Sequence, residues 1–230
     1  MSAHHAVVDF FSNWSIYRAV IEQNCMEHHE ISAALHGLLS RRAGSYCLLD
    51  LGCGDAAAIG PAMRGTPVSR YVGVDCAAPA LDFARATLTG SGAQLDLRVG
   101  QLVDAVETLD TSYDVILASF VLHHLDSAAK RRFLAAAKRR LAPDGELLLI
   151  DVVRRDGETR QQYCNRYDEV VSGWPIGGDK QAAIMTHVRG FDHPEEVSTM
   201  PAWAAELGFA AIETFYSGGS DTQRGWRLMA

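Results

Sequence analysis

The residues with the clearest chemical role lie at the ends of two apolar runs. Asp50 is next to last in the run Tyr46–Leu51, just before a glycine turn at residues 52–54, and Asp75 ends the run Tyr71–Asp75. A glycine turn after a buried strand lets the backbone approach a ligand closely, because no Cβ intervenes. At the carboxyl edge of a sheet, the Asp75 carboxylate can accept hydrogen bonds from both hydroxyls of a ribose. These residues predict a ligand cleft.

The glycine spacing alone leaves the ligand open. Gly52, Gly54 and Ala57 also satisfy a loose dinucleotide-binding pattern, G-x-G-x-x-A. A tight turn between a strand and a helix, with an aspartate in the core, would show the same residues. The rest of the chain has to decide between these interpretations.

A second polar group lies near the N-terminus. Tyr17, Asn24 and His28 are seven and four residues apart, so they share one face of a helix. An apolar helix face carries such groups when it borders a polar cavity, although Tyr17 is equally compatible with a core position. We predict that His28 binds a ligand in this cavity and that Tyr17 or His29 positions the ligand or acts as a base.

A third group lies in the C-terminal half. Tyr163, Arg166 and Tyr167 fall on one helical face at positions i, i+3 and i+4, and Trp174 follows. Arg166 can pair with an acceptor carboxylate through two hydrogen bonds. The aromatic rings can enclose an amine or sulfur nucleophile by stacking or cation–π contact. We predict that these four residues bind the acceptor.

The elements that position these groups alternate along the chain. Apolar runs of strand length are expected at 46–51, 71–75, 95–99, 113–120 and 146–153, and helices at 56–63, 79–88, 101–108 and 128–141. Near-continuous apolar strands between helices are typical of a parallel sheet covered on both faces. Right-handed crossovers then produce a doubly wound α/β fold.

The two ends of the chain depart from this alternation. Residues 4–43 are expected to form an N-terminal helical cap (1–43), and residues 157–207 a helical insertion on the acceptor side. The last stretches, 209–217 and 225–229, are expected to pair as antiparallel strands. We therefore predict a single domain over 1–230 with a seven-stranded sheet, parallel except for one strand near its edge.

Composition narrows the classes of function. The net charge of −7 disfavours a nucleic-acid partner, since binding to phosphates needs concentrated Lys and Arg. No apolar run approaches the roughly 18 residues that cross a bilayer, and the N-terminus has no basic leader, so neither a membrane protein nor a secreted one is expected. The five cysteines form no CxxC pair, which indicates no disulfide framework. A cytoplasmic protein is expected.

Paired histidines raise the question of a metal. They occur at residues 4–5, 28–29 and 123–124. Adjacent side chains diverge on a helix, so such a pair is a poor start for a metal site. We expect no metal.

Four segments, in order, resemble class I S-adenosylmethionine-dependent methyltransferases, especially those that act on small molecules. The segments are LLDLGCGDA, YVGVDCAAPALDFAR, YDVILASFVLHHLD and LAPDGELLLID, within residues 46–153. A dehydrogenase shares features of the first two but not the last two. The terminal strand pair also agrees with the family's antiparallel seventh strand.

The resemblance implies a site for S-adenosylmethionine, with S-adenosylhomocysteine (SAH) as product. The family's acidic residues and glycines contact the methionine end and the ribose, and its histidine-bearing turn lies beside the sulfonium. At the matching and adjacent positions, the residues expected to hold the cofactor are Asp50, Gly52, Cys53, Gly54, Asp75, Cys76, Gln101, Leu102, Ser119 and His123.

One position departs from the family pattern. An acid that bonds the adenine amine often follows the third strand, and here Gln101 stands in its place. Its side-chain carbonyl can still accept that bond, and the Leu102 N–H can donate to the ring. We expect adenine binding to persist. The resemblance also places His124 at the cleft as a candidate base or positioning group.

The expected function is methyl transfer from S-adenosylmethionine to a small-molecule acceptor by in-line displacement, in which positioning supplies most of the rate. Three alternatives stay open: cyclisation of S-adenosylmethionine that releases methylthioadenosine, a nicotinamide-dependent oxidoreductase, and a binding module without turnover. No NPPY-type tetrad follows the fourth strand, where the sequence reads Ser119-Phe120-Val121-Leu122, so methylation of planar exocyclic amines is disfavoured. Neither a nucleic acid nor a membrane is expected as a partner, and the protein is expected to be a monomer or a homodimer.

Overall fold

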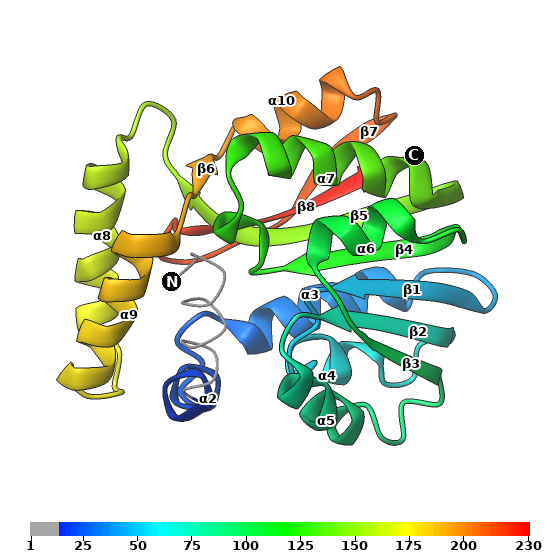
Figure 1. Ribbon diagram of the computed structural model, residues 1–230, viewed down its shortest axis with the longest axis horizontal. Helices are drawn as coiled ribbons and strands as arrows, with labels where there is room; N and C mark the ends of the chain where they lie inside the picture. Colours follow the sequence, from blue (N-terminus) through cyan, green and yellow to red (C-terminus); the bar gives the residue numbers. More distant parts are fainter. Residues whose placement is uncertain (1–13) are drawn as a thin grey trace.

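The computed structural model describes residues 14–230 and centres on one twisted sheet of strand order β3-β2-β1-β4-β5-β8-β7 (Figure 1). The strands are β1 Tyr46–Leu51, β2 Val68–Asp75, β3 Gln94–Val99, β4 Tyr113–Ser119, β5 Leu141–Arg154, β6 Glu195–Glu196, β7 Ala211–Ser217 and β8 Gln223–Met229. Only β8 runs antiparallel to its neighbours within this order, as predicted for one strand near the edge. The two-residue strand β6, which pairs with β5 in parallel, was not predicted.

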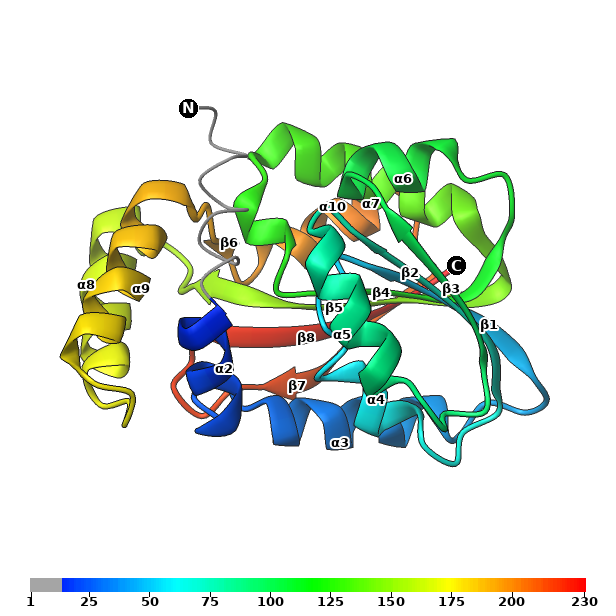
Figure 2. The same cartoon turned by 60° about the horizontal axis from the view of Figure 1, so that its bottom comes forward.

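Helices cover both faces of the sheet (Figure 2). They are α2 Trp14–Glu22, α3 His28–Leu39, α4 Ile59–Met63, α5 Ala78–Thr87, α6 Leu102–Thr108, α7 Ser127–Arg140, α8 Arg160–Ser172, α9 Gly178–Phe191 and α10 Thr199–Glu206, with a 3₁₀ turn η1 at Leu122–His124. Helices α3, α4 and α5 pack on one face, and α6, α7 and α10 pack on the other. This arrangement confirms the predicted doubly wound α/β fold.

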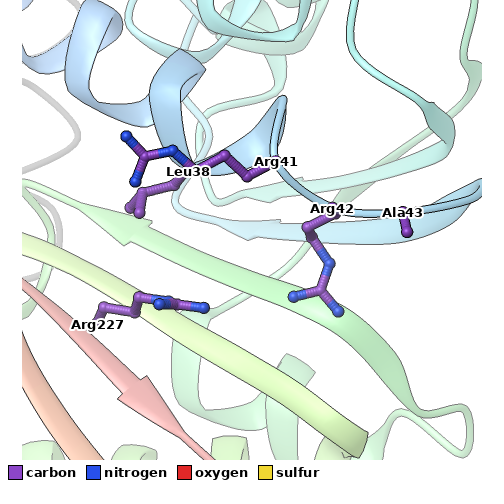
Figure 3. A pocket seen from close by; sticks show the side chains of 5 residues that line it. All are labelled: Leu38, Arg41, Arg42, Ala43 and Arg227. Atoms are coloured by element: carbon purple, nitrogen blue, oxygen red, sulfur yellow. The ribbon is translucent and has the colours of Figure 1, made fainter.

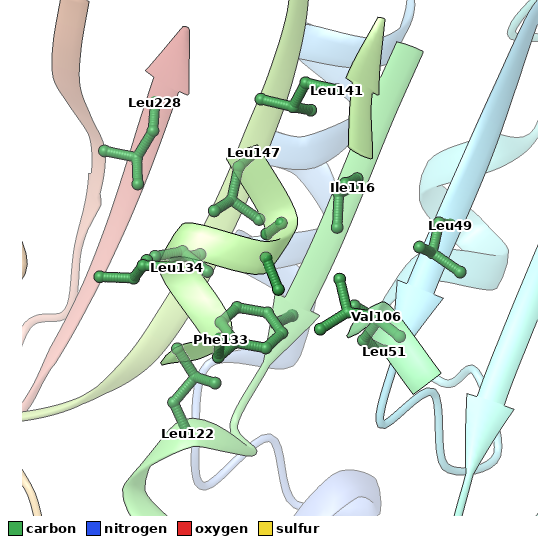
Figure 4. Packing of buried hydrophobic residues seen from close by; sticks show 14 of the residues in the cluster. Leu49, Leu51, Val106, Ile116, Leu122, Phe133, Leu134, Leu141, Leu147 and Leu228 are labelled. Carbon is green, nitrogen blue, oxygen red and sulfur yellow. The ribbon is translucent and has the colours of Figure 1, made fainter. Parts of the chain in front are cut away.

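The core explains why the central strands β1 and β4 are apolar along most of their length. Leu49 and Leu51 pack with Phe133 of α7 on one face (Figure 4), whereas Leu48 packs with Leu35 of α3 on the other. Successive side chains of a strand point to opposite faces, so a strand covered on both sides must be apolar at every position. The sequence pattern of β1 therefore predicted its bounds correctly.

A third cluster joins α2 to α8 and α9 outside the sheet. Ile16 and Val20 of α2 pack against Tyr167 and Val171 of α8 and Ile184 of α9. Figures 1 and 2 show α8 and α9 side by side beyond one end of the strands. These three helices form a roof, whereas α3 and α10, also expected to be cap helices, pack on the sheet. The part of the expected N-terminal cap that precedes Trp14 lies outside the described residues.

Local backbone geometry shifts one helix start. A helix was expected from residue 56, but α4 begins at Ile59. Ala56 has a φ of 59°, in the left-handed region, and the Asp55 carboxylate accepts the N–H of Ala57 at 3.0 Å. These features hold residues 55–57 in a turn, which delays the helix.

Strand β3 forms one edge of the sheet. Asp96 accepts hydrogen bonds from Arg98 on the same strand, at 2.6 and 3.0 Å, and from Arg70 on β2, at 3.1 Å.

Among residues 14–230, no helix is both long and apolar enough to cross a membrane.

Candidate active site

A cavity of about 580 Å³ opens at the carboxyl edge of the sheet, under the roof formed by α2, α8 and α9. The ends of β1, β2 and β4 supply one side of its lining, and α2, α8 and α9 supply the other. The strand order reverses between β1 and β4, and such a reversal is where doubly wound sheets bind ligands. The cavity therefore lies where the sequence predicted a cleft.

A smaller cavity of about 260 Å³ lies near the opposite ends of the strands (Figure 3). Its lining includes Arg42 and Arg227, and both pair with the buried Glu146. These two guanidinium groups are thus engaged within the protein, and the larger cavity is the candidate site.

Asp75 organises the loops at the edge of the cavity. Its carboxylate accepts the N–H of Gly54 at 2.8 Å and the N–H of Ala77 at 2.8 Å. These bonds tie the turn after β1 to the turn after β2. A carboxylate has about four lone-pair positions, so Asp75 keeps acceptor capacity for ligand hydroxyls.

Asp50 lies deeper in the same cavity. Tyr71 donates its hydroxyl to the Asp50 carboxylate at 2.7 Å, and both residues are buried. Burial raises the pKa of Asp50 to about 7; the hydrogen bond from Tyr71 acts against this shift, and the charge of Asp75 adds to it. A cationic ligand group beside Asp50 would favour its ionised form.

The glycine turn fits the close approach of a ligand. Gly52 has a φ of 77°, and a Cβ there would lie 2.3 Å from Val121, so no other residue fits. Gly54 has a φ of 50° and lines the cavity, where the nearest atom to an added Cβ is the Tyr17 hydroxyl at 3.9 Å. The backbone at Gly54 therefore faces ligand space directly.

The structure brings all ten predicted cofactor residues to this cavity. They are Asp50, Gly52, Cys53, Gly54, Asp75, Cys76, Gln101, Leu102, Ser119 and His123. Two carboxylates, glycine backbone and the start of α6 thus converge on one space. This donor and acceptor set fits a ribose, an amino group and an adenine ring.

Tyr17 and His28 reach the cavity from the N-terminal side. The Tyr17 hydroxyl donates to Asp55 at 2.8 Å, and burial raises the pKa of Tyr17. His28 is buried with its ring centroid 5.6 Å from that of Phe120, and burial lowers its pKa to about 4. His28 is therefore neutral at pH 7.

Histidines and one carboxylate meet in the half of the cavity nearest α9. His123 and His124 have ring centroids 3.9 Å apart, and both lie close to Asp192, as does His187. Burial lowers the pKa of His124 to about 4, and His123 acts in the same direction. Burial alone would lower the pKa of His123 too, but Asp151 and Asp192 raise it above its usual value.

This cluster corrects the argument used against a metal. His123 and His124 lie on the 3₁₀ turn η1, where their side chains stay together instead of diverging. Donor atoms of His123, His124 and Asp192 all lie within 4.8 Å of one another.

Tyr167 and Trp174 line the cavity as predicted for acceptor binding, but three other predicted residues do not. His29 is exposed on the outer side of α3, where its N–H donates to Asn24. Tyr163 is fully buried in the roof and stacks on Tyr167 at 5.5 Å. The prediction that His29 and Tyr163 line the cavity is therefore wrong. The side chain of His29 points about 100° away from that of His28 around the helix axis, and Tyr163 is packed inside the roof.

Arg166 is the third correction. It donates two hydrogen bonds to Glu158, both at 2.8 Å, and one to the Asp221 carbonyl at 3.1 Å. It does not line the cavity, because these partners engage its guanidinium elsewhere. Its guanidinium joins α8 to the turn before β8 and does not face an acceptor.

Sequence reasoning missed Asp151 and Asp192. Asp151 lies within strand β5, and Asp192 directly follows α9. A carboxylate within the apolar run 147–153 was the available signal for Asp151. Nothing in the spacing pointed to Asp192, which is 68 residues from His124.

Comparisons with known proteins bear on this geometry. Residues 49–147 match a family model described as a methyltransferase domain. Over 125 residues the chain is 36% identical to ribosomal RNA small subunit methyltransferase C of Pseudomonas aeruginosa. That match covers 52% of this chain but only 36% of the relative, so the chain spans about a third of that protein's length.

Solved structures agree in fold over a longer stretch. The magnesium protoporphyrin IX methyltransferase of Synechocystis, with bound SAH, aligns over 98% of this chain and 99% of its own, with a TM-score of 0.65 and 13% identity. An O-methyltransferase family 2 protein of Planctomyces limnophilus, in complex with apigenin, covers 93% of this chain and 61% of its own (TM-score 0.62, 16% identity). The expected family resemblance is confirmed at the level of domain and fold.

Proposed function

Since this chain carries a methyltransferase domain of the class I, S-adenosylmethionine-dependent fold, we propose that it transfers the methyl group of S-adenosylmethionine to a small-molecule acceptor. The observation that carries the proposal is one continuous cavity. It runs from Asp50 and Asp75 at the strand ends to Tyr167, Trp174 and the histidines under the roof. Cofactor and acceptor then meet inside a single cavity, and the positioning of reactants in such a cavity supplies much of the rate.

The residue roles follow from the lining. Asp75 binds the ribose hydroxyls, Asp50 faces the amino group of the methionine part, and Gln101 with Leu102 binds the adenine. His28, Tyr167 and Trp174 bind the acceptor, while Tyr17 and His124 position it. His124 is neutral at pH 7, so it can accept an acceptor proton, although a pKa near 4 makes it a weak base.

A small acceptor is favoured over RNA by the roof. A volume of about 580 Å³ falls within the range of small-molecule sites. The net charge of −7 is unfavourable for binding a polyanion such as RNA. The sequence after β4 reads Ser119-Phe120-Val121-Leu122 instead of the NPPY-type tetrad typical of enzymes that methylate planar exocyclic amines. The similarity to a ribosomal RNA methyltransferase covers only 36% of that relative. A cytoplasmic location, and a monomeric or homodimeric state, stay predictions.

The test has two parts. Calorimetry should show SAH binding at one site per chain, and a protein that binds no SAH would contradict the proposal. Incubation with S-adenosylmethionine should then release SAH only when an acceptor is added, from a panel of phenols, carboxylic acids and thiols, or from ribosomal subunits. Turnover on ribosomal subunits alone would replace the small acceptor by RNA, and methylthioadenosine formed without an acceptor would indicate cyclisation.

A further inference from the structure

In the part of the cavity nearest α9, nitrogen atoms of two histidines lie close to the same carboxylate oxygen. The Oδ1 atom of Asp192 lies 3.4 Å from Nδ1 of His124 and 3.9 Å from Nε2 of His123. All three residues line the cavity, and Asp192 is 4% exposed. These separations exceed the usual 2.7–3.2 Å of an N–H···O hydrogen bond. Within residues 14–230, Asp192 Oδ1 accepts no hydrogen bond of normal geometry.

The separations suit donors around a metal ion. Zn²⁺ binds imidazole nitrogen and carboxylate oxygen at about 2.0–2.2 Å, so two donors of a tetrahedron lie roughly 3.3–3.5 Å apart. The 3.4 Å between His124 and Asp192 falls in this range. His123 is slightly farther, and a small rotation of its ring would bring Nε2 to the same separation.

The orientation of His123 adds independent support. Its Nδ1 lies 2.5 Å from Asp151 Oδ1, and its backbone N–H donates to Asp151 Oδ2 at 2.9 Å. An ionised carboxylate only accepts, so Nδ1 carries the hydrogen and Nε2 is turned toward Asp192. Metal-binding histidines commonly have such a carboxylate behind them, which fixes the ring and its tautomer.

We propose that His123, His124 and Asp192 bind a divalent first-row transition ion, with Zn²⁺ as the best fit. Two imidazoles and one carboxylate suit this class of ion, whereas Mg²⁺ and Ca²⁺ prefer oxygen donors throughout. Three protein ligands leave one tetrahedral position open, as in catalytic zinc sites. The Nε2 atom of His187 also lies 3.4 Å from Asp192 Oδ1, on the edge of this group.

The open position faces the cavity in which the acceptor is proposed to bind. This consequence rests on the proposed function. An acceptor hydroxyl or thiol that binds the ion loses its proton to solvent more readily, because the ion stabilises the anion. The anion then forms a bond to the methyl carbon while the carbon–sulfur bond breaks, which releases neutral SAH and leaves the charge of the ion unchanged.

The test measures metal binding without any turnover. The full chain, purified without a histidine tag and treated with a chelator, is titrated with Co²⁺ and followed by visible absorption, and with Zn²⁺ by calorimetry. One Co²⁺ per cavity with an intense tetrahedral spectrum is expected. Asp192→Asn and His124→Gln should each weaken binding at least tenfold and abolish that spectrum, and Asp151→Asn should weaken it about 10- to 100-fold.

Matched controls isolate the cluster from other donors. Asp168→Asn, with a half-exposed carboxylate on α8, and His29→Gln, with an exposed imidazole on α3, should bind Co²⁺ as the wild type does. Metal held at His4 and His5 would persist in Asp192→Asn and would thus be recognised. Thermal unfolding checks that each variant folds.

The proposal is overturned if the wild-type protein gives no tetrahedral Co²⁺ spectrum, or if either Asp192→Asn or His124→Gln retains the wild-type spectrum. The three side chains would then form a proton-sharing network only. SAH binding by the metal-free protein is measured separately. Binding of SAH without binding of Co²⁺ would reject the metal site and leave the proposed function standing.

Discussion

Asp75 holds two loops together, and we propose that it also binds the ribose of the cofactor. Asp75→Asn keeps the shape of the side chain but replaces one accepting oxygen by an amide that cannot accept a backbone N–H. We expect SAH binding to weaken roughly 5- to 150-fold, which corresponds to about 1–3 kcal/mol for lost hydrogen bonds to a buried partner. Calorimetry measures the effect. Asp82→Asn, at an exposed position on α5, is the control and should bind as the wild type; equal affinities in both variants would reject the ribose assignment.

Asp50 should make ligand binding depend on pH. Its pKa of about 7 means that it is mostly protonated at pH 5 in the unliganded protein. The ammonium group of SAH favours the ionised carboxylate, so binding at low pH must first remove a proton. Affinity should therefore rise as the pH increases from 5 to 7, by at most tenfold per pH unit, and level off above that.

The Asp50→Asn variant separates this effect from histidine titration. An amide does not titrate, so the difference between the wild-type and variant profiles reports Asp50 alone.

The same raised pKa of Asp50 also affects the stability of the folded protein. Relative to Asp50→Asn, the free energy of unfolding of the wild type should fall as the pH rises from about 4 through 7, because ionisation is costly in the folded state. Parallel profiles for the two proteins would show that Asp50 does not titrate in this range.

Residue types predicted the cofactor side better than the acceptor side. Asp50 and Asp75 end strands, and the carboxyl ends of parallel strands meet at one edge, so strand order alone brings them together. Arg166 shows the opposite case. Its spacing placed it on a face with Tyr163 and Tyr167, but Glu158 and Asp221, which lie elsewhere in the chain, decide where its guanidinium goes.

Arg166 leads to a prediction about an element. Its pair with Glu158 is mostly buried, with side chains 14% and 10% exposed, and it anchors α8. Arg166→Ala should lower the free energy of unfolding by about 2 kcal/mol, because the Glu158 carboxylate loses both guanidinium hydrogen bonds and keeps the backbone N–H of Arg155. Urea unfolding measures this loss, and the SAH affinity of the folded variant should stay unchanged.

Arg189 offers a matched control between the same two helices. It pairs with Asp168 across α8 and α9, and both side chains are 49% exposed. Solvent screens such a pair, so Arg189→Ala should cost less than about 1 kcal/mol. If Arg166→Ala were no more destabilising than Arg189→Ala, Arg166 would not anchor α8.

Element bounds were predictable where burial dictates composition and less so where a turn intervenes. The run at β1 was located correctly because both faces of that strand are covered. The start of α4 was misplaced by three residues, because the left-handed backbone of Ala56 leaves no mark on an alanine-rich sequence. Strand β6 is too short for any periodicity to show, and its pairing with β5 depends on tertiary structure alone.

At the scale of the whole molecule, the roof is built separately from the sheet. Among the described residues, the cluster of α2, α8 and α9 includes no strand residue. Outside this cluster, the Glu27 carboxylate, just before α3, accepts hydrogen bonds from the Tyr216 hydroxyl and from the N–H of Gly219. Units with their own cluster open cooperatively at less than the global cost. Ligand entry should therefore involve movement of this roof.

Hydrogen exchange tests the movement. SAH should slow exchange of backbone amides in 14–22 and 178–191, which border the cavity, while α6 and α7 on the sheet should change little. Mass spectrometry of the exchanged protein resolves these segments. Uniform slowing across all helices would mean that the ligand stabilises the fold as a whole and that the roof does not open as a unit.

The edge strand β3 has a consequence for behaviour at high concentration. Its outer backbone groups have no strand neighbour within the sheet order, and edges of this kind can template the joining of further chains. The Asp96 and Arg98 charges stand on this edge, and another molecule that paired there would have to strip them of water. These charges should therefore disfavour fibre-like aggregation at β3, while the separate pair between Asp96 and Arg70 joins β3 to β2.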